Sequence, residues 1–410
     1  MLLGAASYVV LYQKSKDFLN PFGITVLVWL GVAGLASCQL SHLQTPWPAL
    51  MYITVLLFPV TVFTLGMLTV RPAPKQRKKI AYSQPYLIFS RLMFLACFLC
   101  SVLEWAKQGF VLTLLSDAVD TKALVATIPV IHYGTVFLPF CAMASVLEWC
   151  NRASFEKLSK PYLVFSILWT VFHSLFIVSS RGTLLLLAMG TIYVVFSGKK
   201  VPFKTLVPLV LMVVVGFVLI SKLRIHSMSL VFHVVEGYPL FSALYSYSAL
   251  SFENLNRLVQ KGPAFTLFTH SLGGFFELFG LGGLITRVPS EVTEFFNAPT
   301  LCYPFYEDLG VAGVVVFPAL IYGAVALFYR KSQQKLGYTL LLAAMQKAIW
   351  VSFFGNYFTA SRSDLLPYLV VFLCVMVMEH GEKMLAWKPL GVLYTKVFMN
   401  ARIKKYCDVL

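Results

Sequence analysis

Residues 47–70 read WPALMYITVLLFPVTVFTLGMLTV, and residues 71–79 read RPAPKQRKK. The first stretch has 24 residues without a charged side chain, and a helix needs roughly 20 apolar residues to cross a bilayer. The second stretch places five basic side chains directly after it, which is typical of the cytoplasmic end of a membrane helix. Together they predict one transmembrane helix and its direction.

The rest of the chain repeats this pattern. Of its 410 residues, 59% are hydrophobic and 12% are charged, about half the charged fraction of a soluble domain. Its apolar runs do not alternate every second residue, which excludes a β-barrel. We predict an all-α, polytopic, single membrane domain over residues 1–410. Its eleven expected spans are 1–12, 22–43, 47–70, 86–105, 124–147, 161–179, 182–197, 205–221, 308–329, 337–358 and 364–379.

The charge distribution predicts the orientation of these spans. If the loop with Lys14 and Lys16 is cytoplasmic, 23 of the 33 basic residues lie inside and 11 of the 17 acidic residues lie outside. The net charge of +16 then reflects the basic inner loops that membrane proteins commonly carry. Nucleic acid is therefore not an expected partner.

One segment interrupts the series of spans. Residues 222–307 are too long for an ordinary connection, and we expect them to form a large outward-facing loop. The loop is not a polar linker, because Phe265–Phe268 and Phe275–Leu284 are apolar. We predict interfacial helices on the outer membrane face, or a re-entrant element, beside a cavity.

Four arginines fall on the outer side, where the charge rule disfavours them: Arg181, Arg224, Arg287 and Arg362. Guanidinium groups bind phosphate oxygens bidentately and stay charged, so we predict that the four form a pyrophosphate-binding site. The alternative is that they contact lipid headgroups or cap helices. Lys347 lies within an expected span, and an ionisable residue at that depth normally faces a partner or a watery cavity; we place it among the substrate-binding residues.

Candidates for proton transfer also lie on the outer side. We select Glu253, His270 and Asp308 as catalytic, and Asn254 and Tyr303 as sugar-binding residues, since carboxylates and histidine serve as general bases. The alternative is that the carboxylates are merely solvated. The sequence carries no nucleotide-binding or metal-ligand motif, and we expect no metal and no cofactor.

Several outer segments, taken in order, carry a resemblance to a known family. They are Ser180–Thr183, Ser251–Leu255, Asn297–Thr300, Tyr306–Gly313 and Ser361–Asp364. This series resembles the Wzy-type oligosaccharide repeat-unit polymerases of bacteria, which make O-antigen and capsular polysaccharide.

The resemblance implies a GT-C-like glycosyltransferase in the bacterial cytoplasmic membrane. Donor and acceptor would both be oligosaccharides linked to undecaprenyl pyrophosphate, and the growing chain would pass onto a new lipid-linked repeat unit at the outer face. Membrane lipid and a chain-length regulator protein would be further partners. Two alternatives stay open: an O-antigen ligase with the same donor, and a flippase or transporter for the lipid-linked unit.

Overall fold

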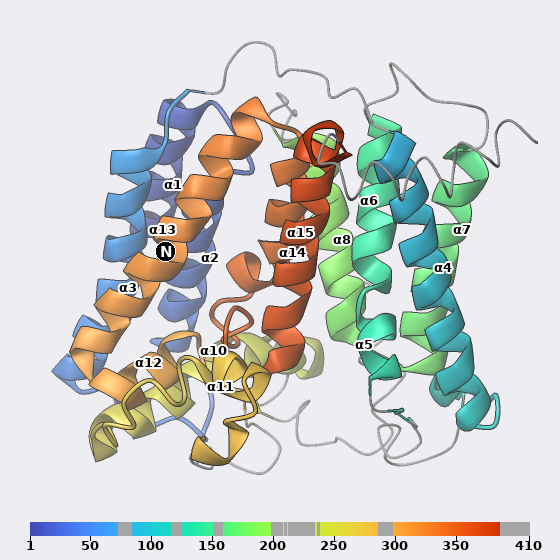
Figure 1. The fold of residues 1–410 in the computed structure, drawn as a ribbon. Coiled ribbons are helices and arrows are strands. Elements are labelled where there is room, and N and C mark those ends of the chain that lie inside the picture. Colours follow the sequence, from blue (N-terminus) through green and yellow to red (C-terminus); the bar gives the residue numbers. More distant parts are fainter. Residues whose placement is uncertain are drawn as a thin grey trace, which may run out of the picture.

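The structure is a computed structural model that describes residues 1–72, 84–115, 130–150, 159–197, 238–285 and 298–385, together with residues 125, 127, 128, 208, 211, 234 and 235. Every regular element in these residues is a helix (Figure 1). The predicted span 205–221 lies outside the described residues, apart from two positions. Arg224 and Arg287 lie outside them as well.

The helices follow one another in this order: α1 Leu2–Ser15, α2 Pro21–Ala36, α3 Ala49–Thr69, α4 Gln84–Lys107, η1 Thr113–Leu115, α5 Ile131–Val136, α6 Leu138–Cys150, α7 Ser159–Phe172, η2 His173–Ile177, α8 Arg181–Phe196, α10 Pro239–Lys261, α11 Gly273–Leu278, η4 Gly282–Leu284, α12 Cys302–Leu309, α13 Val311–Gln334, α14 Gly337–Trp350 and α15 Arg362–Leu385.

The prediction of an all-α membrane protein is confirmed at this level. Five described segments are long and apolar enough to cross a membrane: Ala49–Thr69, Leu87–Lys107, Ile131–Cys150, Lys160–Ile177 and Val311–Gln334. Two shorter apolar helices, α2 and α8, accompany them. The count of eleven spans stays a prediction.

The helices form two groups joined by a central pair (Figure 1). α1, α2, α3 and α13 make one group, and α4 to α8 make the other; α14 and α15 stand between them and pack on both. In the first group Trp29 lies against Phe58, with 4.3 Å between ring centroids. Thr25 and Tyr322 share a buried hydrogen bond of 2.9 Å between their hydroxyl oxygens. Aromatic packing with satisfied polar groups therefore holds this group together.

α10, α11 and α12 gather at one end of the bundle (Figure 1). We call this the outer end, because the charge pattern predicts that it faces outward. α10 and α11 belong to the predicted loop 222–307, and α10 is amphipathic: its Tyr245, Phe252 and Leu255 are completely buried, whereas Lys261 is exposed. The apolar side of α10 packs against α2, α3 and α12.

The central pair departs from the predicted span 337–358. α14 ends at Trp350 after 14 residues, about 21 Å at 1.5 Å per residue, which is shorter than the roughly 30 Å hydrocarbon core. The residues after Trp350 do not continue the helix, and Asn356 forms a local turn among them. Its side-chain oxygen accepts the backbone N–H groups of Phe358 and Thr359, both at 3.2 Å, a local turn that competes with helix.

Candidate functional site

The connection between α14 and α15, residues 351–361, is the centre of the outer end. Groups from other segments anchor it. Ser251 of α10 donates to the carbonyl oxygen of Phe353 at 2.6 Å, and the backbone N–H of Leu301 donates to that of Ser352 at 2.8 Å. We call residues 351–361 the central loop.

The start of α11 also binds the central loop. The backbone N–H of Gly274 donates to the carbonyl oxygen of Thr359 at 2.7 Å. A Cβ atom on Gly274 would lie 2.5 Å from the carbonyl oxygen of Ser361, and one on Gly273 would lie 2.6 Å from that of Ala360. Only glycine permits this approach, so the GG pair joins α11 to the central loop.

Arg181 is the first residue of α8, and the preceding turn presents it at the outer end. Ser180 caps the helix by accepting the backbone N–H of Thr183 at 3.3 Å. Before it, the π-helical turn η2 ends, and Ser179 adopts a left-handed φ of 50°. The Arg181 guanidinium donates a hydrogen bond of 3.0 Å to the Tyr247 hydroxyl and lies 5.0 Å from the centroid of that ring.

Lys347 meets the same turn from α14. Its ammonium nitrogen would lie 3.4 Å from a Cβ atom on Gly182, so it sits beside the first turn of α8, next to Arg181. It also lies 3.8 Å from the centroid of the Tyr357 ring in the central loop. The Asp364 carboxylate is near enough to interact with it electrostatically.

Two cations from different helices therefore gather where α8 begins. A helix N-terminus carries a partial positive charge and exposed N–H groups, and it favours anions over cations. Arg181 begins this turn and Lys347 lies against Gly182 within it, while the Asp364 carboxylate interacts electrostatically with Lys347. Arginine, lysine and a helix N-terminus together suit a phosphate or diphosphate.

Arg362 occupies a different part of the outer end. It is exposed, it lies 5.1 Å from the centroid of the Tyr133 ring, and its backbone N–H donates to the Glu277 carboxylate at 2.8 Å. Of the four predicted arginines, the structure describes two, and they face different aromatic rings. Lys347, not a second arginine, is the cation that it places beside Arg181.

His270 pairs with Glu307 of α12. Its Nδ1 lies 2.7 Å from Glu307 Oε2, and the side chains are 12% and 0% exposed, respectively. The adjacent carboxylate raises the pKa of His270, although burial opposes the shift. Within the described part of the chain, no hydrogen-bond partner reaches His270 Nε2. The pair therefore has the form of a histidine base with an orienting carboxylate.

Asp308, predicted to be catalytic, lies in a closed hydrogen-bond network next to His270. Its completely buried carboxylate accepts the Thr266 hydroxyl and the backbone N–H groups of His270 and Ser271, the latter two at 3.3 and 2.7 Å. These bonds occupy the oxygens that a catalytic acid or base would need. Asp308 positions the backbone that carries His270, and a direct catalytic role does not fit its surroundings.

Glu253, also predicted to be catalytic, is enclosed by hydrogen-bond donors in the structure. It is completely buried, and its oxygens accept the backbone N–H and hydroxyl of Thr45 at 3.2 and 2.9 Å, Asn256 Nδ2 at 3.2 Å and Arg257 Nε at 3.0 Å. A completely buried carboxylate whose oxygens accept this many hydrogen bonds has no free surface for a substrate. Glu253 therefore joins α10 to residues 43–46 and lies outside the candidate site.

The two predicted sugar-binding residues are buried too. Asn254 Nδ2 donates to the carbonyl oxygen of Ala298 at 2.9 Å, and Tyr303 is 7% exposed within α12. In this conformation both side chains support segment 298–303 and present little surface to a sugar. The aromatic faces beside Arg181 and Lys347 belong to Tyr247 and Tyr357.

Sequence reasoning missed two members of this arrangement. Tyr357 lies in GNYF at residues 355–358, and no spacing signal links it to Lys347 ten residues earlier. Glu307 is one of several outer acids in the sequence, and only the fold selects it as the partner of His270. Such pairings depend on tertiary contacts between separate segments.

Comparison with protein-family models, with curated proteins and with solved structures found no match to this chain.

Proposed function

We propose that this protein is a membrane glycosyltransferase that polymerises oligosaccharide repeat units carried on a lipid pyrophosphate. The observation that carries the proposal is the pair Arg181 and Lys347 at the first turn of α8. They lie at the end of a membrane-type bundle, where the diphosphate of a lipid-linked sugar would sit at the bilayer surface. The resemblance to repeat-unit polymerases supports the same substrate class.

In the proposed reaction the donor's bond between the anomeric carbon and the phosphate oxygen breaks. A hydroxyl of the acceptor's terminal sugar forms the new glycosidic bond, and lipid pyrophosphate leaves. Arg181 and Lys347 would stabilise the charge that develops on the leaving diphosphate, an effect that is large when the groups are fixed in advance. Tyr247 and Tyr357 hold these cations in place.

His270 is our candidate for the base. Its Nε2 would accept the proton of the attacking hydroxyl, and Glu307 would orient the ring and stabilise the imidazolium. Ser271, the next residue, accepts a hydrogen bond of 2.5 Å from Thr359 of the central loop through its carbonyl oxygen. Since Nε2 is buried in this conformation, acceptor binding would have to open a path to it, as catalytic contacts often tighten only with substrate.

The decisive experiment supplies a synthetic lipid-pyrophosphate repeat unit to the purified protein in detergent and sizes the products. A ladder of lipid-linked polymer supports the proposal. A single transfer onto a lipid A core acceptor would identify a ligase instead, and movement of the unit across vesicles without a new glycosidic bond would identify a transporter. Lys16→Ala is the matched control for the cation variants, because Lys16 is exposed and follows α1, far along the chain from the site.

A further inference from the structure

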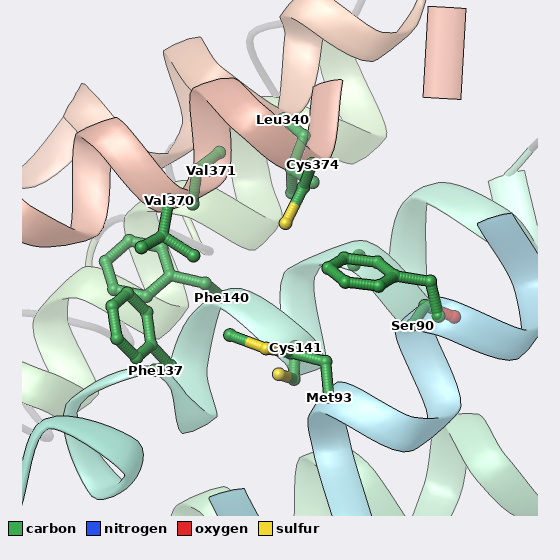
Figure 2. A pocket seen from close by; sticks show the side chains of 11 residues that line it. Ser90, Met93, Phe137, Phe140, Cys141, Leu340, Val370, Val371 and Cys374 are labelled. Carbon is green, nitrogen blue, oxygen red and sulfur yellow. The ribbon is translucent and has the colours of Figure 1, made fainter. Parts of the chain in front are cut away.

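A second feature lies deeper in the bundle, where α4, α6, α14 and α15 enclose a pocket (Figure 2). Its lining is almost entirely hydrocarbon and sulfur. Met93, Cys141, Leu340, Val371 and Cys374 all point into it. The single hydroxyl in the lining, that of Ser90, is already engaged with Glu148 at 2.9 Å. A polar ligand would find no partner here, so the pocket suits a hydrocarbon chain.

The position of this pocket relative to Arg181 and Lys347 indicates which kind of hydrocarbon chain it would bind. Leu340 and Lys347 are seven residues apart on α14, and Asp364 and Val371 are seven apart on α15. Seven residues are close to two turns of helix, so each pair lies on one helix face, separated by about 10.5 Å along the axis. The pocket therefore lies directly beneath Lys347 and Asp364 on both helices.

α14 and α15 take part in both levels, and the helices beside them are in contact with one another. Near Lys347 the neighbours are Gly182 of α8 and Asp364 of α15, and at the pocket they are α6, which packs against α8, and α15 again. Leu92 of α4 and Leu373 of α15, outside the pocket lining, are 56% and 61% exposed, so the outer sides of these two helices are apolar and suited to contact with lipid. A molecule with an anionic head and a long apolar tail fits the two levels together.

We infer that the pocket binds the polyprenyl tail of the lipid-linked diphosphate whose head lies at Arg181 and Lys347. This inference rests on the proposed function and adds to it a second point of substrate recognition. An acyl chain of a bulk phospholipid is the competing occupant, and it lacks a diphosphate head at the cation pair. A bound tail would fix the position of the donor relative to α14, so that its diphosphate stays at one point along this helix.

The test uses photolabelling. The full-length protein in nanodiscs of phosphatidylethanolamine and phosphatidylglycerol is exposed to a long-chain polyprenyl diphosphate with a diazirine in its tail, and the labelled residues are mapped by mass spectrometry. We expect labels at the pocket residues, suppressed by unlabelled polyprenyl diphosphate. A short-chain diphosphate with a terminal diazirine should label near Lys347 and Tyr357 instead.

Val371→Trp fills the pocket and should lower labelling at least about tenfold, since each CH₂ group kept out of an apolar site costs about 0.8 kcal/mol. Leu373→Trp is the matched control, because this neighbour faces lipid, and it should label like the parent protein. If Val371→Trp does not fold, the comparison of long and short probes in the unaltered protein decides the question.

The outcomes separate the two proposals. Labels spread over lipid-facing positions such as Leu56 and Val60 of α3, or labels displaced by added phospholipid, would overturn the tail site. If Arg181→Ala abolishes diphosphate binding while the pocket stays unlabelled, the tail site fails and the proposed function stands. If the pocket is labelled but the purified protein forms no glycosidic bond from the lipid-pyrophosphate repeat unit, the proposed function fails and the tail site stands.

Discussion

α10 has two polar faces, and the molecule uses them differently. On one face Glu253, Asn256 and Arg257 form a closed network with residues 43–46. On the other face Tyr247 meets the Arg181 guanidinium, and Ser251 anchors the central loop. The sequence gives both faces similar polar residues, so composition does not distinguish them.

The contrast lies in how charge is balanced. In the closed network a buried carboxylate meets a guanidinium and backbone donors, and such a pair is costly to break. At the other face the Arg181 guanidinium contacts the uncharged Tyr247, and Lys347 lies at the same turn of α8, whose N-terminus favours anions. The charge-matched network therefore indicates a bracing role for Glu253, and two cations at a helix N-terminus indicate an anion site at Arg181 and Lys347. Four predictions test this distinction.

The largest effect should follow Arg181→Ala. Loss of one fixed group that stabilises developing charge typically lowers turnover about 100- to 1,000-fold, and we expect a loss of this size in polymerisation rate. Arg181→Lys should recover only part of it, because lysine keeps the charge without the planar fork. Full-length polymer from Arg181→Ala would remove this residue from the mechanism.

Glu253→Gln should act on stability instead. Removing the carboxylate leaves Arg257, 29% exposed, without its ion-pair partner, and we expect the free energy of unfolding to fall by about 2–3 kcal/mol. Thermal unfolding in detergent measures the change. Turnover per folded molecule should match that of the parent protein; a stable variant that has lost turnover would contradict the bracing role.

Gly274→Ala tests the joint between α11 and the central loop. The added methyl group would clash with the Ser361 carbonyl oxygen, and overpacking of this kind costs about 1–3 kcal/mol. Gly283→Ala is the control, because a Cβ atom there meets nothing within 4 Å. Comparable unfolding temperatures for the two variants would show that the joint is not tight.

The smallest effect should follow Glu307→Gln, and it depends on pH. The carboxylate raises the pKa of His270 above its ordinary 6.5, so the pair stabilises the fold fully below pH 6.5 and loses this contribution as pH rises through the raised value. The stability deficit of the variant should therefore be greatest below pH 6.5 and shrink above it.

The pH dependence of activity tests the same pair, His270 and Glu307. A base must be neutral, so polymerisation by the parent protein should increase as pH passes the raised pKa of His270. Glu307→Gln lowers that pKa, and the rising limb of the pH–rate profile should move to lower pH. A profile that does not move would exclude His270 as the base.

The sequence predicts helices well where apolar runs are long, as in Ala49–Thr69 and Val311–Gln334. It does worse where an apolar run leaves the helix: the run 337–358 looks continuous, but α14 ends at Trp350 and Asn356 forms a local turn beyond it. For the site, the anomalous charge of Arg181 and Lys347 is visible in the sequence. Their proximity, and the enclosure of Glu253 and Asp308, depend on contacts that no spacing encodes.

The anchoring of the central loop restricts how molecules could enter and leave the protein. Because α10, α11 and the residues before α12 all hold it, the bundle cannot part along its own axis without losing those bonds together. Alternating access would require that separation. Under the proposed function, substrate would therefore arrive sideways, along the plane of the bilayer or over its rim, and a lengthening glycan would leave by the same route.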